Sequence, residues 1–396
     1  MRPFAKASVV GVAMLLAGCG GGGTSSEPSD DSEAGKKTVA LAFVGALTGE
    51  LANLGVNARD GAKLAVDQAN ASEAVGPGVK LVLKEFDTQG DPAQASTLKD
   101  RFINDESIIG VVGPVYSGET KAVLPSLQEA GLVMVSPSAT NVDLPSLVPG
   151  QTVFHRIIPD DGEQGKGLAD YISKKLRSKS AAYVDDNSEY GKGLSEGTRT
   201  LLEAVGVRTA VSDSIDPDAQ DFSAAVNKVK AAKPDLVFYG GYFPEAGRFK
   251  KQMADAGVTA TFISGDGALD PAFIEAAGAA GAEGAQITCP CKLATADAPG
   301  ALGAFAKNYE AAVKRAPGTY SSEGYDAATV FVEGLRKGAT TRAAMLDFVE
   351  NIEPIPGVSK SIDFADNGNV TTSGVFVYEV KGGKLTVLGS TDELVA

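Results

Sequence analysis

Histidine is almost absent from this chain, because His155 is the only one among 396 residues. A Ser-His-Asp arrangement needs a histidine beside its nucleophile, and the chain has no G-x-S-x-G motif. We expect His155 to be a strand residue rather than a general base. The sequence has no histidine cluster, and Cys289 and Cys291 are its only close cysteines. It therefore predicts no metal site, no cofactor and no enzyme.

No nucleotide-binding motif is complete. The best candidate for a phosphate loop, residues 113–120, has Glu119 where such a loop needs lysine. A carboxylate there would repel phosphate. No G-x-G-x-x-G follows the first predicted strand, so a dinucleotide site is not expected either.

Basic residues are few, with 36 Lys and Arg against 50 Asp and Glu. Loss of residues 1–18 would remove Arg2 and Lys6 and leave 34 basic residues, a net charge of −16. Such an acidic surface argues against nucleic acid as a partner and against binding to anionic lipid by charge.

Long apolar runs are missing as well. The apolar stretch 7–15 is too short to span a bilayer, follows a basic start and precedes Leu-Ala-Gly-Cys19. This pattern predicts a lipoprotein signal peptide over 1–18 and lipidation of Cys19, which would anchor the exported protein to the outer face of the cell membrane. The alternative is an ordinary secretory peptide that happens to carry a cysteine.

Residues 19–37 are rich in glycine, serine and acidic side chains, and we expect a flexible linker there. The chain from Thr38 onward is too long for one typical domain and suits two. No later apolar stretch is long enough to cross a membrane.

After the linker, short β-rich runs alternate with helical patterns. This alternation predicts an α/β protein with two doubly wound parallel-sheet lobes and a cleft between them. Strands are expected at 39–47, 79–87, 107–114, 132–138, 181–186, 207–215, 235–241, 261–267 and 284–289, and helices at 58–69, 92–103, 119–130, 161–175, 191–205, 222–232 and 244–256.

In doubly wound sheets, ligands bind beyond the carboxyl ends of the strands. The turns at those ends combine glycine with hydroxyl or carboxylate side chains, and we expect them to form a polar ring of modest charge. They are residues 45–49, 113–118, 136–141, 185–190, 240–242 and 265–267.

At these turns the chain resembles the branched-chain amino-acid binding proteins of ABC importers, which have the type I periplasmic binding protein fold. The resemblance covers nearly all of 39–380. Its segments are VGALTGELANLG, GVVGPVYSGET, VSPSATN, FHRIIPDDGEQG, VDDNSEYGKGL, FYGGYFPEAG, ISGDG and IDFADNGNV, in the family's order and spacing. It implies lobe 1 at 38–159 and 290–365, and lobe 2 at 160–289 and 366–396, joined by a hinge.

The resemblance also implies a ligand site. Ser117 and Thr140 would bind the α-carboxylate at a helix start, a carbonyl of Ser138, next to Ala139, would accept from the α-ammonium, and Asp266 would complete the ammonium site. Tyr190 and Tyr242 match aromatic residues that close over the ligand. Singly, such residues are ordinary helix caps, turn residues or packing. Leu54 stands where relatives for leucine-like ligands often carry an aromatic side chain, which alters the pocket.

Cys289 and Cys291 lie, by the same resemblance, where the chain returns from lobe 2 to lobe 1. In a regular strand they would be about 6.6 Å apart, near the upper limit for a disulfide, so Pro290 would have to bend the chain. A hinge disulfide is the preferred interpretation; two free thiols and a metal site are the alternatives.

The sequence thus predicts a monomeric, lipid-anchored protein that captures an aliphatic, branched-chain type amino acid and delivers it to the permease of an ABC importer. Within the same fold, the ligand could instead be an amide, urea or an aromatic acid. A sensory module, read by a signalling partner, is the alternative of a different class.

Overall fold

The computed structural model describes residues 36–396. The predicted signal peptide, Cys19 and nearly all of the predicted linker lie outside the described residues. Within 36–396, no helix combines the length and the apolar character needed to cross a bilayer.

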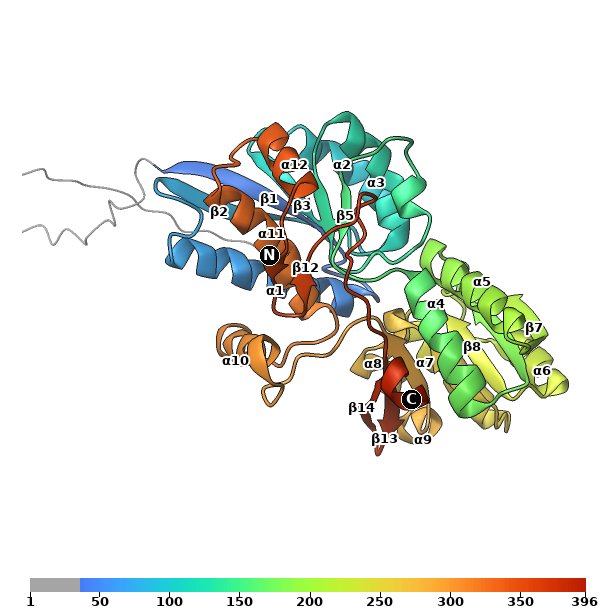
Figure 1. The fold of residues 1–396 in the computed structure, drawn as a ribbon. Coiled ribbons are helices and arrows are strands. Elements are labelled where there is room, and N and C mark those ends of the chain that lie inside the picture. The colour runs from blue at the N-terminus through green and yellow to red at the C-terminus, as the bar shows by residue number, and fades with distance from the viewer. Residues whose placement is uncertain (1–35) are drawn as a thin grey trace, which may run out of the picture. The chain divides into compact units, whose positions relative to one another are not determined.

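The first sheet has five parallel strands in the order β2-β1-β3-β4-β5. These are β1 (Lys37–Gly45), β2 (Val79–Asp87), β3 (Ile108–Val112), β4 (Met134–Ser136) and β5 (Phe154–Arg156). Its helices are α1 (Ala52–Ala71), α2 (Pro92–Ile103), α3 (Ser117–Glu129), α10 (Gly300–Val313), α11 (Ser321–Arg336) and α12 (Arg342–Glu350). We call this sheet and its helices lobe 1 (Figure 1).

Strand β1 shows how the sequence covers both faces of this sheet. Val39, Leu41 and Phe43 pack with α1 and α11 in one core cluster. The alternate residues Ala40 and Ala42 pack with α2 and α3 in another. Side chains of a strand alternate between its faces, so an uninterrupted apolar run suits a parallel sheet with helices on both sides.

The second sheet has seven strands in the order β14-β13-β10-β9-β8-β6-β7. These are β6 (Ser180–Asp185), β7 (Arg208–Ser214), β8 (Leu236–Gly240), β9 (Thr261–Ser264), β10 (Gln286–Cys289), β13 (Phe376–Lys381) and β14 (Lys384–Ser390). Its helices are α4 (Asp161–Asp170), continued by a π-helical segment Tyr171–Leu176, then α5 (Glu189–Ala204), α6 (Ser223–Ala232), α7 (Phe243–Asp255), α8 (Pro271–Ala277), α9 (Ala279–Ala282) and α13 (Thr391–Val395). We call these elements lobe 2.

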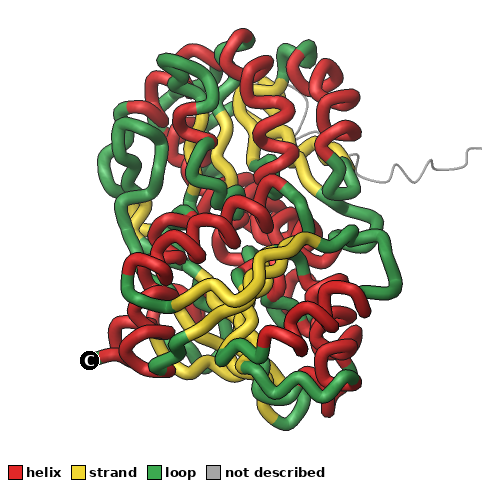
Figure 2. Tube along the Cα trace, turned by 90° about the vertical axis from the view of Figure 1, so that its right-hand side faces the viewer, coloured by secondary structure: helices red, strands yellow, loops and turns green. Residues whose placement is uncertain are grey.

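Three segments connect the two sheets, at 157–160, 290–299 and 363–375 (Figure 1). Figure 2 shows the strands of the two sheets as separate groups. Short elements complete the described chain, namely the 3-10 turns Leu144–Ser146 and Asp266–Ala268 and the two-stranded pair β11 (Ile355–Pro356) and β12 (Ser361–Ile362). The predicted lobe boundaries at 159/160, 289/290 and 365/366 stay a prediction.

The expected α/β fold with two parallel-sheet lobes is confirmed, with one refinement. Strands β13 and β14 pair antiparallel with β10 and with each other, so the second sheet is mixed. No pattern in the sequence predicted this hairpin. The predicted helix 92–103 coincides with α2, whereas α1 begins six residues before the expected 58. His155 lies in β5, as expected of a strand residue.

Candidate functional site

The start of α3 is built from the turn after β3. Ser117 is the first residue of the helix and is buried. Its Oγ accepts a hydrogen bond from the N–H of Asn141 at 3.2 Å, so its own O–H remains available to donate. A helix start carries N–H groups without intrahelical partners and a partial positive charge, which favours an anion. Ser117 therefore suits a carboxylate ligand.

Glu119, two residues further on, does not repel an anion at this helix start. It is fully buried, and burial raises the pKa of its carboxyl to about 8, so the group is mostly protonated at neutral pH. Thr88 donates a hydrogen bond to it, and Glu119 accepts from the N–H of Tyr116 at 3.4 Å.

The turn after β4 lies beside this helix start. Ser136 Oγ accepts from the N–H of Ala139 at 2.9 Å, and Ser138 Oγ donates to the carbonyl of Val115 at 2.6 Å. These bonds fix the turn against the loop before α3. Thr140, at its end, is fully buried, and its hydroxyl lies beside the carboxyl of Asp161.

Arg156 holds the same turn from the other side, a role that the sequence analysis missed. Its side chain is fully buried and donates to the carbonyls of Ala139 at 3.0 Å and Asn141 at 2.8 Å. It also contacts Asp160 at 3.2 Å. Burial lowers its pKa to about 10, so it stays charged at neutral pH. The Ala139 carbonyl is therefore already engaged with a protein donor.

Asp266 lies in lobe 2, in the short turn after β9, and is fully buried. Its Oδ1 accepts from Tyr190 at 2.8 Å and its Oδ2 from Tyr320 at 2.5 Å. Burial raises the pKa of Asp266. Tyr320, which the sequence analysis did not single out, belongs to lobe 1 and has a left-handed backbone with φ of 69°. That conformation is uncommon for a bulky residue and persists where its surroundings enforce it.

Asp161 is a second buried carboxylate that the sequence analysis missed. It is the first residue of α4 and is 5% exposed, and the hydroxyl of the fully buried Thr140 lies close enough to be its hydrogen-bond donor. Burial, with the nearby Asp266 as a further cause, raises its pKa well above the usual range. The sequence pair Asp160-Asp161 could have indicated this residue. Asp160 alone caps the helix, accepting from the N–H of Glu163 at 3.0 Å, so Asp161 is not needed as a cap.

Three tyrosine rings line up between the lobes. Tyr116 of lobe 1 meets Tyr242 of lobe 2 edge to face at 5.4 Å between ring centroids, and Tyr242 meets Tyr190 at 5.1 Å. The Tyr116 hydroxyl donates to the carbonyl of Leu51 at 2.6 Å. Leu54 is fully buried and shares a core cluster with Tyr116. The structure thus gathers Ser117, Thr140, Tyr190, Tyr242 and Asp266 at the facing surfaces of the two lobes.

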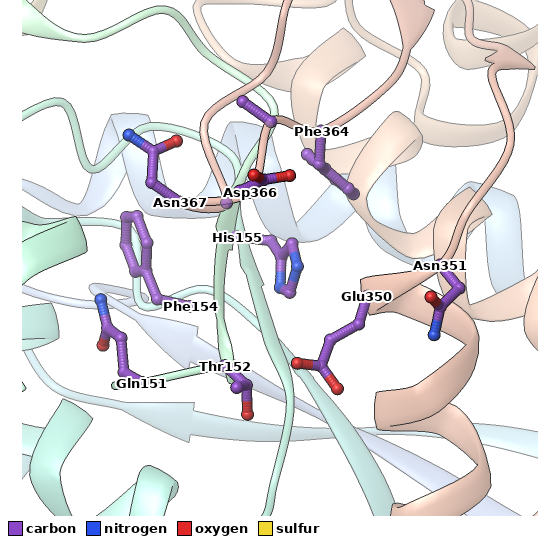
Figure 3. A pocket seen from close by; sticks show the side chains of 11 residues that line it. Gln151, Thr152, Phe154, His155, Glu350, Asn351, Phe364, Asp366 and Asn367 are labelled. Carbon is purple, nitrogen blue, oxygen red and sulfur yellow. The ribbon is translucent and has the colours of Figure 1, made fainter. Parts of the chain in front are cut away.

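Two cavities bear on the site, one that reaches Tyr242 and one that lies apart from the predicted ligand residues. One of about 360 Å³ is lined by residues of both lobes, including Glu50, Gln89, Asp186, Tyr242 and Glu245. The other, of about 300 Å³, lies at β5, with His155 between Asp366 and Glu350 (Figure 3). None of the predicted ligand residues lines it. Burial lowers the pKa of His155 to about 4, which leaves the imidazole neutral at pH 7.

Cys289 ends β10 and is joined to Cys291 by a disulfide with a Cα–Cα distance of 4.9 Å. The bond lies at the start of the 290–299 connection between the sheets. Among residues 36–396, no three or more His, Cys, Asp or Glu side chains are placed to hold a metal ion.

Comparison with known proteins identifies the family. A family model described as periplasmic binding protein matches residues 38–384. The chain belongs to this family. Membership implies an extracytoplasmic protein, and the type I fold expected from the sequence is confirmed.

Among characterised relatives, a Leu/Ile/Val-binding protein of Rhizobium johnstonii is 32% identical over 356 residues, covering 88% of this chain and 93% of that protein. A leucine-, isoleucine-, valine-, threonine-, and alanine-binding protein of Pseudomonas aeruginosa is 28% identical, covering 86% and 90%. The leucine-binding protein LivK of Thermotoga maritima superposes with a TM-score of 0.81 at 26% identity, covering 89% of this chain and 98% of that one. LivJ of Streptococcus pneumoniae, solved in complex with isoleucine, also gives 0.81 at 26% identity, covering 89% and 100%.

Proposed function

We propose that this protein is the substrate-binding component of an ABC importer and that its ligand is an aliphatic, branched-chain amino acid. One observation carries the proposal. A buried helix start with the hydroxyls of Ser117 and Thr140 lies close to the buried carboxylates Asp161 and Asp266. The first group complements a carboxylate and the second an ammonium, so together they complement a zwitterion.

The names of the relatives support an aliphatic side chain, because those proteins bind leucine, isoleucine and valine. Ser138 and Ala139 shape the floor of the site, and Tyr190, Tyr242 and Leu54 would surround the side chain. No bond is made or broken in this function. The ligand shifts the population toward the closed arrangement of the lobes, which the permease then recognises.

A binding screen tests this assignment. Twenty amino acids, acetamide, urea and benzoate are added separately, and the thermal unfolding midpoint is recorded. A ligand at about 100 times its dissociation constant adds about 2.7 kcal/mol of stability, so leucine, isoleucine or valine should give a clear upward shift. A shift confined to acetamide, urea or benzoate would assign the protein to the alternative ligand class.

Delivery to a permease is tested by uptake. Vesicles that carry a branched-chain amino-acid ABC permease and its ATPase should accumulate labelled amino acid only when the protein is added as a monomer. Binding without uptake, together with capture by a signalling receptor, would instead support the sensory alternative.

The lipid anchor at Cys19 is part of the proposal and has its own test. Cys19→Ser should release the protein from washed membranes and leave ligand affinity unchanged, because the residue precedes the folded lobes. The wild-type protein is the control. A variant that stays with the membranes after a high-salt wash contradicts the anchor.

A further inference from the structure

The disulfide between Cys289 and Cys291 lies at one of the three segments that connect the lobes. Cys289 is the last residue of β10, and Cys291 belongs to the 290–299 connection. Their Cα atoms are 4.9 Å apart, against about 6.6 Å for residues two apart in a regular strand. The bond therefore holds a turn in the chain at the point where it leaves the sheet of lobe 2.

The residues after this turn are fastened to lobe 2 as well. The hydroxyl of the buried Tyr378, in β13, donates to the carbonyl of Cys291 at 3.3 Å and accepts from the N–H of Leu293 at 2.9 Å. The disulfide and these two hydrogen bonds keep residues 289–293 with lobe 2. Bending of this connection is therefore confined to the residues beyond Leu293.

A cavity of about 330 Å³ adjoins the disulfide, and none of the predicted ligand residues lines it. All three connecting segments contribute to its wall, through Pro159, residues 290–292 and residues 372–374, and residues of α11 and β12 complete it. We call this space the hinge cavity. Because every connection between the lobes borders it, a group that enters there acts on the hinge and not on the ligand site.

The two cysteines differ in their access to the hinge cavity. Cys291 is 3% exposed and lines it, whereas Cys289 is fully buried and does not. Lys292 and Lys360 also line the hinge cavity, and Glu323 is the one acidic residue of its wall. Two cations against one carboxylate favour an anion, and the thiolate anion is the form of a thiol that attacks a disulfide.

We propose that Cys291 is a thiol-exchange site and that the hinge cavity admits a low-molecular-weight thiol. The thiolate attacks Sγ of Cys291, the bond to Cys289 breaks, and Cys289 leaves as a thiolate that takes up a proton. Cys291 then carries the small molecule as a mixed disulfide. A second thiolate attacks the sulfur of that small molecule and releases Cys291 as a thiol. The two small thiols lose two electrons and become a disulfide, and the disulfide of the protein gains those electrons.

Breaking the bond removes a constraint from the hinge. Residues 289–291 can then extend, which widens the range of lobe arrangements. A ligand that needs the closed arrangement binds less tightly when that arrangement is a smaller fraction of the population. Global stability should change less, because so short a loop constrains the unfolded chain little. Only the effect on ligand affinity rests on the proposed function.

The first experiment compares the two sulfurs in folded protein. In a Cys19→Ser background, Cys289→Ala leaves Cys291 as the single thiol, and Cys291→Ala leaves Cys289. Each variant is treated with cystine, the disulfide of L-cysteine, and the mixed disulfide is followed by mass spectrometry. Cys291 should react about tenfold faster or more, because only its sulfur can be reached, and the two thiols should react alike in urea. Equal rates in the folded variants overturn the assignment.

The wild-type protein gives a second measurement that needs no cysteine variant. After incubation with L-cysteine and rapid alkylation with iodoacetamide, peptide mass spectrometry should find cysteine on Cys291 and the alkyl group on Cys289. The reverse pattern overturns the proposal. So does a disulfide that resists L-cysteine in the folded protein and reacts only in urea.

The second experiment tests the hinge. Spin labels at Glu106→Cys in lobe 1 and Glu203→Cys in lobe 2, in a Cys19→Ser background, report the distance between the lobes. The double variant Cys289→Ala with Cys291→Ala should give a broader distribution than the protein with the disulfide. An unchanged distribution overturns the effect on the hinge.

The affinity for L-leucine is measured by calorimetry with and without dithiothreitol. Reduction should weaken binding to the wild-type protein by about fivefold or more, the lower end of typical coupling between sites. The double variant Cys289→Ala with Cys291→Ala is the matched control and should not respond to dithiothreitol. Equal affinity of the oxidised and the fully reduced wild type overturns the effect on the ligand site. If the wild-type protein binds no amino acid, the proposed function fails, and the thiol reactivity and the distance between the lobes still decide this proposal.

Discussion

Helix α3 of lobe 1 and helix α7 of lobe 2 begin alike. Each follows a tyrosine, Tyr116 or Tyr242, and each has a buried glutamate three residues later, Glu119 or Glu245. The two tyrosine rings meet edge to face between the lobes. The surroundings differ in a way that decides which helix start can accept an anion.

The second residue of α3 is Gly118, which has a backbone N–H, whereas the second residue of α7 is Pro244, which has none. Burial raises the pKa of Glu245, and the neighbouring carboxyl of Asp186 raises it further. The α7 start of lobe 2 therefore presents fewer backbone N–H donors than the α3 start, and the acidic pair Asp186 and Glu245 beside it disfavours an anion. The comparison favours the α3 start of lobe 1, and not the α7 start of lobe 2, as the place for the carboxylate of the proposed ligand.

The largest expected effect on ligand binding concerns the hydroxyls beside the α3 start. Ser117→Ala and Thr140→Ala should each reduce the affinity for the bound amino acid by about 1.5 to 3 kcal/mol, because each removes a hydrogen bond to a charged carboxylate. Isothermal titration calorimetry measures the change.

Ser390→Ala is the matched control for this pair. Ser390 caps α13 in lobe 2 and accepts from the N–H of Glu393 at 3.2 Å. Its loss should cost stability and leave ligand affinity unchanged. Equal affinity in both cleft variants and the wild type would mean that the α3 start does not hold the carboxylate.

The next effect is the pH dependence of stability from the two buried glutamates. Glu119 has a pKa of about 8 in the folded protein against an ordinary value of 4.5, so between these pH values the unfolded chain has lost a proton that the folded protein keeps. Stability from this group is full below about pH 4.5 and falls as the pH rises, by about 1.4 kcal/mol per pH unit. Glu119→Gln should flatten this decline in urea unfolding measured from pH 5 to pH 8.

The two lobes should differ in how much a neighbouring acidic residue changes the pH dependence of the free energy of unfolding. Burial is the largest cause of the raised pKa of Glu245, and Asp186 adds to it. Glu245→Gln should therefore remove the contribution of Glu245, whereas Asp186→Asn should only reduce it. Burial is the largest cause of the raised pKa of Glu119, and the carboxyl of Asp87 is a minor cause. Asp87→Asn should therefore leave the pH dependence that comes from Glu119 in place. Parallel curves for Glu119→Gln and the wild type would show that Glu119 is ionised in the folded protein.

The sequence predicted the layers of the fold well because parallel sheets require apolar runs that alternate with amphipathic helices. Predicted strand 235–241 and helix 92–103 match β8 and α2 closely for this reason. The turns after β3 and β4 were also recognisable, since glycine and hydroxyl residues follow buried strands there.

The residues that were missed depend on contacts far apart in the chain. Tyr320 is 54 residues from its partner Asp266, and no local pattern links them. Asp161 follows a helix cap and resembles an ordinary acidic residue of a first helical turn, so only its burial distinguishes it. The β13–β14 hairpin was missed because its first strand, β13, pairs with β10, which lies 87 to 93 residues earlier in the chain.

The smallest expected effect compares the two tyrosines themselves. Tyr116→Phe removes the hydrogen bond from the hydroxyl to the buried carbonyl of Leu51 and should lower the free energy of unfolding by about 1 kcal/mol. The Tyr242 hydroxyl has no hydrogen-bond partner within residues 36–396, so Tyr242→Phe should change stability by much less. Urea unfolding at pH 7 measures both.

Tyr116→Phe and Tyr242→Phe compare the α3 and α7 starts directly, because both substitutions keep the ring contact between the lobes and remove only the hydroxyl oxygen. A loss in Tyr116→Phe alone would show that the α3 tyrosine is fastened to the loop before α1, while the α7 tyrosine is held by its ring. Such an arrangement would leave the lobe 2 ring free to follow lobe 2 as the cleft opens. Equal losses in the two variants would mean that the Tyr242 hydroxyl is also bound, and that lobe 2 carries a fixed wall of the site as lobe 1 does.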